Sequence, residues 1–326
     1  LVMATVVKIK GSAYRRPGAR MLLAPSGGKA GMISGGCLDG DVRERAMRVL
    51  ASGRPELVTY DSTSPDDIIF GLGLGCNGVV QVLIEPVTTG DGDGLLAFLA
   101  DCRQQRRAGR IVTLFPDGRS PSRVEAGTRL LHWPDGRVTS SFSDDALRSC
   151  LLAAMRDTEN RRHAIRHLSL PNGDRVSALI ETIAPAPSLL LFGAGDDAIP
   201  VAQMAKAVGW HVTVVDARAE YAKPERFPEA DTVLCLRPEA AGDDPRLAVK
   251  PETLVMIMTH SYSRDKELLK RLLPQAPRYI GALGPKVRTQ NLIDELARDG
   301  VRFAPELLEC LHGPAGLDIG AETPEE

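Results

Sequence analysis

Short hydrophobic segments separated by glycines and prolines dominate the first part of the chain. Five of these segments are rich in β-branched or other apolar residues and predict strands: ATVVKI (4–9), ARMLLA (19–24), KAGMIS (29–34), ELVTY (56–60) and VVQVLIE (79–85). A helix is predicted among them, because apolar residues recur at helical spacing from Leu38 to Leu50. We therefore expect a compact module of mixed α and β structure from Ala4 to Pro86.

The pattern weakens between Val87 and Pro187. Helices are predicted within 91–110 and 144–156, and strands at 110–115, 128–133, 137–142 and 175–185. Pro185-Ala186-Pro187 then predicts a linker between domains. The chain contains no internal repeat and no low-complexity tract.

From Ser188 onward, predicted strands alternate with predicted helices. The strands are 188–192, 211–216, 231–236, 254–259 and 278–283, and the helices are Asp197 to Val208, Asp265 to Leu273 and Val287 to Arg298. This alternation is typical of βαβ units and a parallel sheet. We therefore predict an α/β protein, with an N-terminal mixed α+β domain (1–187) followed by a Rossmann-like, doubly wound domain (188–326).

The charge balance narrows the class of protein. The 326 residues include 40 Lys and Arg against 42 Asp and Glu, which argues against a nucleic-acid binder. No run of eighteen apolar residues predicts a membrane span. The six cysteines form no Cys-x-x-Cys pair, so we expect a reduced, cytoplasmic protein without a structural zinc site.

Both ends of the sequence look like the interior of an element. Leu1-Val2-Met3 resembles part of a strand, and Thr323-Pro324-Glu325-Glu326 has the pattern of a helix start. We therefore expect further residues beyond both ends.

A glycine loop opens the predicted Rossmann-like domain. Gly193 and Gly195 lie between a strand and a helix, and Asp216 ends the next strand. This is the context of a dinucleotide fingerprint, in which glycines admit a phosphate and the acid accepts from a ribose hydroxyl. Asp196 and Asp197 depart from this fingerprint, because two carboxylates would repel a pyrophosphate. The alternative is that these acids simply stabilise the start of the helix.

Two later loops follow the same logic. His260 lies after a strand, where ligands of open α/β sheets bind, although it would serve equally as a capping or surface histidine. Gly281 and Gly284 precede Lys286 and Arg288 at a helix start, so this loop is another candidate for ligand binding. Lys286 and Arg288 would also be ordinary residues of a solvated helix face.

The first module carries a second kind of candidate site. Gly35 and Gly36 precede Cys37 just before a helix, and this position favours an anion and lowers a thiol pKa. A buried, inert thiol is the alternative. Cys76 lies in a similar glycine-rich loop, and Arg16 and Arg20 flank a Pro-Gly turn as a candidate anion clamp or a charged hairpin.

Several long motifs resemble the XdhC/CoxI family of maturation factors for molybdenum hydroxylases. They are GSAYRRPGARM, GMISGGCLDGDV, FGLGLGCNGVVQVLIEP, LLLFGAGDDAIP, VTVVDAR, RFPEAD, MIMTHSYSRD, YIGALGPK and GPAGLDIGAETPEE. They occur in family order and leave about 87–177 unmatched. Asp196 departs from the histidine expected in the first Rossmann loop, which bears on the ligand that this loop prefers.

The resemblance implies a chaperone rather than a catalyst. Such a protein would bind the molybdenum cofactor, as molybdopterin or its dinucleotide form, protect it, promote its sulfuration with a cysteine desulfurase, and insert it into a molybdenum hydroxylase apo-enzyme. The family's glycine-flanked cysteines fall on Cys37 and Cys76, and Cys37 would contact the molybdenum. A homodimer is also expected. An NAD(P)-dependent oxidoreductase and a nucleotide-binding metabolite protein remain the alternatives, the former with His260 as its acid/base candidate.

Overall fold

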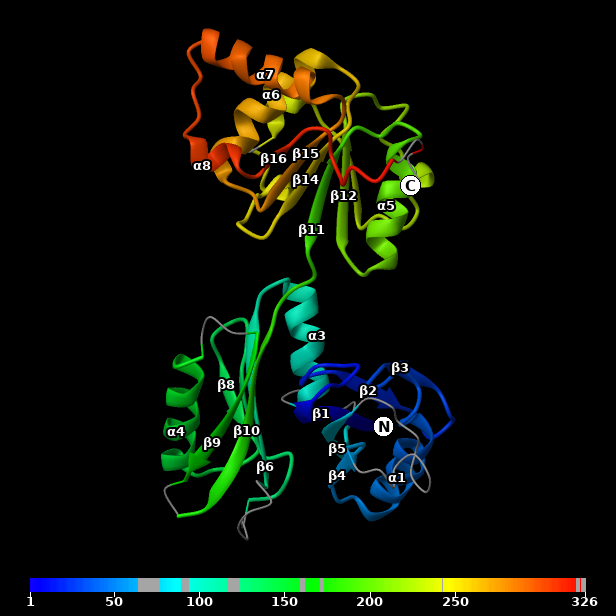
Figure 1. Cartoon of the computed structure of the whole chain (residues 1–326), viewed down its shortest axis with the longest axis vertical. Helices are drawn as coiled ribbons and strands as arrows, with labels where there is room; N and C mark the ends of the chain where they lie inside the picture. The colour runs from blue at the N-terminus through cyan, green and yellow to red at the C-terminus, as the bar shows by residue number, and fades with distance from the viewer. Residues whose placement is uncertain are drawn as a thin grey trace. The chain divides into compact units, whose positions relative to one another are not determined.

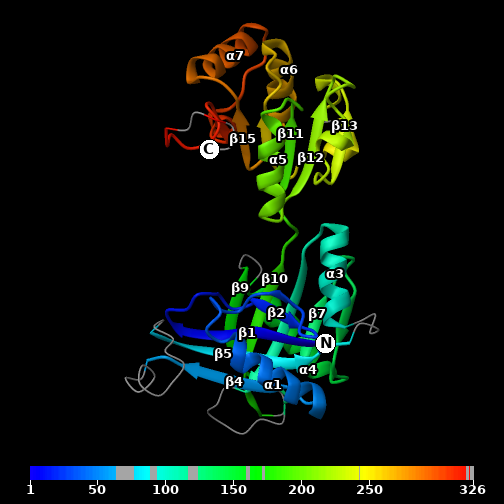
Figure 2. The same ribbon diagram turned by 90° about the vertical axis from the view of Figure 1, so that its right-hand side faces the viewer.

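The computed structural model describes residues 1–63, 77–88, 94–116, 124–158, 162–170, 173–241, 243–320 and 323. The chain divides into two compact units, Leu1–Pro185 and Ala186–Glu326. It passes from one unit to the other directly between strands β10 (Arg175–Ile183) and β11 (Ser188–Phe192), as Figure 2 shows.

The first unit begins with an antiparallel sheet of order β3-β2-β1-β5-β4. Its strands are β1 (Val2–Gly11), β2 (Arg20–Leu23), β3 (Lys29–Gly31), β4 (Glu56–Asp61) and β5 (Gly78–Pro86). Helix α1 (Asp39–Ser52) covers one face, because Val42, Ala46 and Val49 follow helical spacing and are buried against the sheet.

A second antiparallel sheet follows, with order β8-β7-β6-β10-β9. Its strands besides β10 are β6 (Gly109–Pro116), β7 (Arg129–His132), β8 (Val138–Ser140) and β9 (His163–Ser169). The helices of this part are α3 (Leu95–Gln105) and α4 (Asp145–Arg156). Figure 1 shows α4 beside the second sheet and α1 beside the first, on the outer sides of the unit.

Buried side chains join the two sheets of this unit. Val7 and Leu83 of the first sheet pack against Phe115 and Leu179 of the second. The two sheets thus share a dry interior, and polar residues of one sheet that enter it need partners from the other.

The second unit is built on a parallel sheet of order β13-β12-β11-β14-β15-β16. Its strands after β11 are β12 (His211–Asp216), β13 (Thr232–Cys235), β14 (Leu254–Ile257), β15 (Tyr279–Ala282) and β16 (Leu311–His312). Numbered from β11, this order is the 3-2-1-4-5-6 arrangement of the Rossmann fold.

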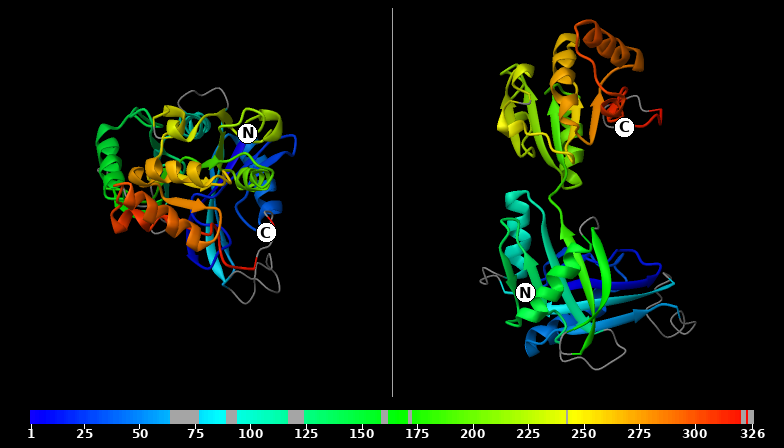
Figure 3. Two further views of the ribbon diagram at one scale, coloured as in Figure 1. Left: turned by 90° about the horizontal axis from the view of Figure 1, so that it is seen from above. Right: turned by 90° about the vertical axis from the view of Figure 1, so that its left-hand side faces the viewer.

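Helices cover both faces of this sheet. They are α5 (Ala198–Ala207), α6 (Tyr262–Leu272), α7 (Lys286–Arg298) and the short α8 (Pro305–Leu308). Single 3-10 turns lie at Pro224–Arg226, Pro238–Ala240, Pro245–Leu247 and Leu273–Gln275. Helix α5 packs on one face, and α6 and α7 pack on the other (Figure 1 and Figure 3).

The architecture confirms the predicted α/β class, with a mixed N-terminal part followed by a Rossmann-like sheet. Three local predictions need correction. Strand β9 was not predicted, because its residues are mostly polar and only Ala164 is buried. The two-residue β16 was also missed, and α6 begins at Tyr262 instead of Asp265.

Candidate functional site

A buried serine organises the loop before helix α1. Ser34 is 3% exposed, and its Oγ accepts hydrogen bonds from the N–H groups of Gly36 (3.0 Å) and Leu38 (3.3 Å). The same hydroxyl donates to Asp39 at 3.1 Å. Gly36 has a φ of +113°, a left-handed conformation that favours glycine. The loop is therefore fixed by its own residues.

This loop presents Cys37 to solvent, two residues before α1 begins. Cys37 is therefore not the buried thiol of the alternative interpretation. Cys37 also lines a small cavity of about 30 Å³ together with Tyr14 and Arg15. The structure thus brings Cys37 next to the arginine-containing loop that the sequence had marked separately.

The two candidate arginines of that loop differ in environment. Arg16 is exposed and has no ion-pair partner in the described part of the chain. Arg20 forms two hydrogen bonds with Glu181 (3.0 and 2.6 Å) and a third with the Gly18 carbonyl. Arg20 joins the two sheets of its unit, and its Nη atoms are engaged by Glu181 and Gly18, so an anion would have to compete with Glu181 for this guanidinium. Cys76 lies outside the described residues.

At the Rossmann edge, Gly193 is required by packing. Its φ is +109°, and a Cβ added there would lie 2.1 Å from the Met258 carbonyl oxygen. The end of β11 can therefore pass close to the end of β14 only with glycine at this position. A Cβ on Gly195 would lie 2.5 Å from the Asp197 carboxylate.

Asp216 does not present an open carboxylate. It accepts from the Ala194 N–H at 2.8 Å, and from the N–H, Nε and Nη2 of Arg218 at 2.9, 3.0 and 2.8 Å. Burial would raise the pKa of Asp216, but the Arg218 and Ala194 donors outweigh it and hold the pKa below its usual value. A ribose hydroxyl would have to displace Arg218 to reach this carboxylate.

The two acids of the glycine loop are each matched by a positive or protonatable group. Asp196 pairs with Arg226 at 2.7 Å, and Asp197 lies 2.8 Å from the Nε2 atom of His260. His260 has a φ of +56°, which turns its ring toward the loop after β11. The repulsion that the sequence suggested between these carboxylates and an anion is therefore reduced.

Gly281 and Gly284, the last two candidate glycines, lie where neighbouring side chains leave no room for a Cβ atom. A Cβ on Gly281 would lie 2.6 Å from the Met256 sulfur, and one on Gly284 would lie 2.9 Å from the Arg288 side chain. Arg288 pairs with the buried Asp265 at 2.7 Å, whereas Lys286 is exposed at the start of α7. The Arg288–Asp265 pair therefore joins α7 to α6.

Arg264 is a candidate that the sequence reasoning missed. It lies in the first turn of α6 and lines a cavity of about 10 Å³ with Gly193 and Asp216. Among the described residues it has no ion-pair partner. Its place just after a Rossmann loop was the available signal, but the motif around it drew attention only to His260.

The described residues contain neither a candidate metal site nor a candidate membrane-spanning helix. Within them, no group of three or more His, Cys, Asp or Glu side chains is placed to hold a metal ion. No described helix is both long and apolar enough to cross a membrane.

Comparison with known proteins places the chain in a family. A model of the XdhC Rossmann domain matches residues 189–326, and a model of the XdhC and CoxI family matches residues 1–61. A Bacillus subtilis protein, named as a probable subunit of xanthine dehydrogenase, is 32% identical over the whole chain and 89% of its own length. The chain belongs to the XdhC and CoxI family.

Two further proteins are similar to all or most of this XdhC/CoxI chain. A solved structure from Bacillus halodurans, named a xanthine dehydrogenase, matches the whole chain and 87% of its own length, with a TM-score of 0.78 and 29% identity. The Escherichia coli protein named molybdenum cofactor insertion chaperone PaoD is 24% identical over 89% of this chain and 69% of its own length.

Proposed function

We propose that this protein carries the molybdenum cofactor as cargo and delivers it to a molybdenum hydroxylase apo-enzyme of the xanthine dehydrogenase or carbon monoxide dehydrogenase type. It protects the cofactor on the way and assists its sulfuration by a cysteine desulfurase. The observation that carries the proposal is the exposed Cys37 thiol, in the region matched by the XdhC and CoxI model. The name of the PaoD relative supports the same cargo.

The chemistry of the loop suits this cargo. Molybdenum held by a dithiolene is a soft centre, for which a thiolate is a matching ligand. The cofactor's phosphate would meet the start of α1, where Asp39 and Asp41 would repel it if they were unpaired. Asp39 pairs with Lys29 and Asp41 pairs with Arg45, both at 2.6 Å. Their charges are thus largely compensated.

The Rossmann edge supplies a second binding surface for the nucleotide form of the cofactor. Gly193 and Arg264 line one cavity, and Gly195 lies beside the Asp197–His260 pair. A hydride-transfer enzyme would use the same edge for NAD(P), which is the second candidate function. The hydrogen bond from Arg218 to Asp216 argues against this second function. In NAD(P)-dependent enzymes the acid at this position binds the ribose, and here it is already engaged by Arg218.

Anaerobic purification from a molybdenum-replete host tests the proposal. We expect molybdenum and pterin absorbance to copurify with the wild-type protein, and Cys37→Ala to lose most of the metal and to activate an apo-hydroxylase poorly. Cys235→Ala is the matched control, because Cys235 is also exposed but lies in the other unit. Equal molybdenum content in the two variants would contradict the role of Cys37.

Two further measurements complete the test. Bound nicotinamide together with saturable NAD(P) reduction would favour the oxidoreductase instead. We also propose that the protein acts in the cytoplasm as a homodimer, so light scattering should give about twice the chain mass of 35.1 kDa.

A further inference from the structure

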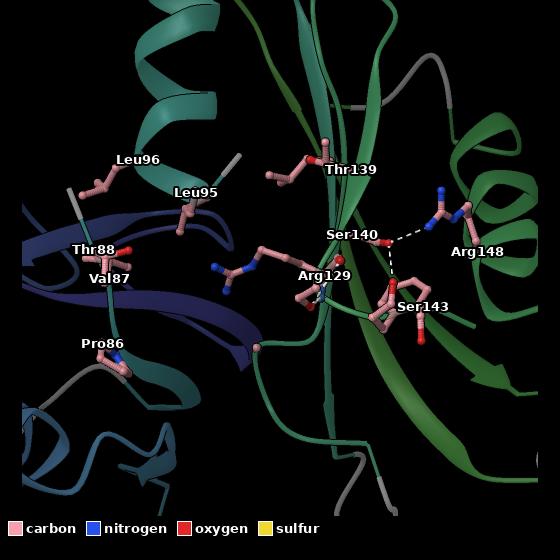
Figure 4. Close-up of a pocket in the computed structure, with 15 residues that line it drawn as sticks. Pro86, Val87, Thr88, Leu95, Leu96, Arg129, Thr139, Ser140, Ser143 and Arg148 are labelled. Atoms are coloured by element: carbon pink, nitrogen blue, oxygen red, sulfur yellow. Dashed lines mark hydrogen bonds between the residues drawn. The ribbon is translucent and has the colours of Figure 1, made fainter. Parts of the chain in front are cut away.

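Another cavity, of about 580 Å³, lies in the first unit, well away in sequence from the loops discussed above. It is bordered by the end of β5, the first turn of α3, strands β7 and β8, and the first turn of α4 (Figure 4). All of its lining residues fall between 86 and 148, outside both segments matched by the family models. Family membership therefore assigns it no role.

One wall of the cavity is cationic. The Arg148 guanidinium donates to the Ser140 hydroxyl at 3.2 Å, and its only ion-pair partner among the described residues is Asp145, 3.8 Å away and 95% exposed. Such an exposed pair at that distance neutralises little of the charge. Ser143 also lines the cavity, and its hydroxyl has no hydrogen-bond partner in the described part of the chain. Most of the positive charge of Arg148 is thus available to an anionic group.

The facing wall holds an arginine that is already paired and the start of a helix. Figure 4 shows Arg129 pointing toward Leu95 and Leu96 at the start of α3. Arg129 is 12% exposed and pairs with the buried Glu85. Helix α3 starts after Gly94, which has no side chain to accept the first N–H groups, and its first turn carries no acidic residue in this described segment. A helix start of this kind favours a negative charge nearby.

Apolar side chains separate these two walls. Val87, Leu95, Leu96, Leu131 and Phe142 line the cavity among polar residues such as Thr88, Thr139 and Ser141. Ligand sites commonly combine such an apolar lining with a few fixed polar groups. An inorganic ion alone would leave most of the 580 Å³ unfilled.

We propose that this cavity binds a small organic anion. Its charged group, a phosphate or a carboxylate, bonds to Arg148, and its apolar body lies along Leu131 toward Leu95 and Leu96. The positive start of α3 contributes to the potential that attracts it. This site is independent of the cargo proposed above.

Phenyl phosphate is a suitable probe, because it joins a phosphate to an apolar ring. Trp133 reports on the site: it packs in one cluster with the lining residues Leu95 and Leu131, and it donates to Thr139, another lining residue, at 2.8 Å. In a Trp210→Phe background Trp133 is the only tryptophan. We expect a saturable fluorescence change with a dissociation constant below about 1 mM, and equilibrium dialysis should give one probe per chain. Inorganic phosphate should bind at least about tenfold more weakly.

Two variants identify the site. Arg148→Gln should weaken phenyl phosphate binding by about tenfold or more, because a charge-assisted hydrogen bond is lost. Leu96→Glu should abolish binding by placing a carboxylate in the cavity, while an acid in the first turn of α3 keeps the helix favourable. Arg166→Gln is the matched control, since Arg166 is exposed on the opposite edge strand, β9.

The outcomes separate clearly. Loss of binding in Leu96→Glu and in Arg148→Gln, with wild-type affinity in Arg166→Gln and unchanged unfolding profiles, supports the proposal. Wild-type affinity in either cavity variant overturns it, as does the absence of saturable binding by dialysis up to about 10 mM probe.

Discussion

Asp265 is predicted to hold the Rossmann edge together, and its removal can be measured. The carboxylate is 2% exposed, pairs with Arg288 at 2.7 Å and accepts from the Thr259 hydroxyl. Removing one partner of a buried ion pair costs about 3–5 kcal/mol, because the other charge is left unpaired. Asp265→Ala leaves Arg288, which is 22% exposed and still donates to the Leu283 carbonyl, so we expect the lower value of about 3 kcal/mol.

The reciprocal change should cost more. Arg288→Met leaves the deeper of the two charges with Thr259 as its hydrogen-bond partner, so we expect about 5 kcal/mol. The double variant removes both charges and should be more stable than Arg288→Met alone, because no uncompensated charge remains. This ordering depends on the different burial of the two side chains.

Urea unfolding in a Trp133→Phe background measures these effects, because Trp210 then reports on the second unit alone. With a slope of about 1–3 kcal/mol per molar urea, a loss of about 3 kcal/mol lowers the midpoint by about 1 M or more. Asp299→Ala is the control, since Asp299 pairs with Lys266 at 2.8 Å but is 60% exposed. A midpoint for Asp265→Ala equal to that of this control would refute the reasoning.

Other consequences are equally open to test. Cys37→Ala should change the unfolding free energy by less than about 0.5 kcal/mol, because the side chain is exposed. Native alkylation followed by mass spectrometry should modify Cys37 and spare the buried Cys102. Since the folded pKa of Asp216 lies below 3.8, its stabilising contribution is complete above that pH and is lost as pH falls further; acid titration of Asp216→Asn should lack this loss. Gly193→Ala should cost about 3 kcal/mol or more in thermal unfolding, because its Cβ would overlap the Met258 carbonyl.

The second unit was easier to predict than the first. Its strands are continuous apolar runs, and helices long enough to be recognised separate several of them, so the parallel sheet follows from the pattern. Strand β9 gave no such signal, because an edge strand with one fully buried residue, Ala164, need not alternate.

The carboxyl edge of the parallel sheet was predictable, but the side-chain pairs at that edge were not. Glycine loops after strands correctly located the Rossmann edge, because the carboxyl ends of parallel strands share one edge. That Asp196 meets Arg226 and Asp197 meets His260 depends on residues 30 and 63 positions apart, which no local pattern encodes. The 580 Å³ cavity was equally hidden, since its walls come from the region of weakest periodicity.

The connection between the units has a mechanical consequence. Strand β10 lies between β6 and β9, and β11 lies between β12 and β14, so the linker joins two strands that are each paired on both sides. A pull along the chain through residues 184–187 would load hydrogen bonds to two neighbours at once in either sheet. Glu181, near the end of β10, is further anchored by Arg20. Force applied across the linker is therefore carried first by interior strands, whose extraction requires the hydrogen bonds to both neighbours to break together.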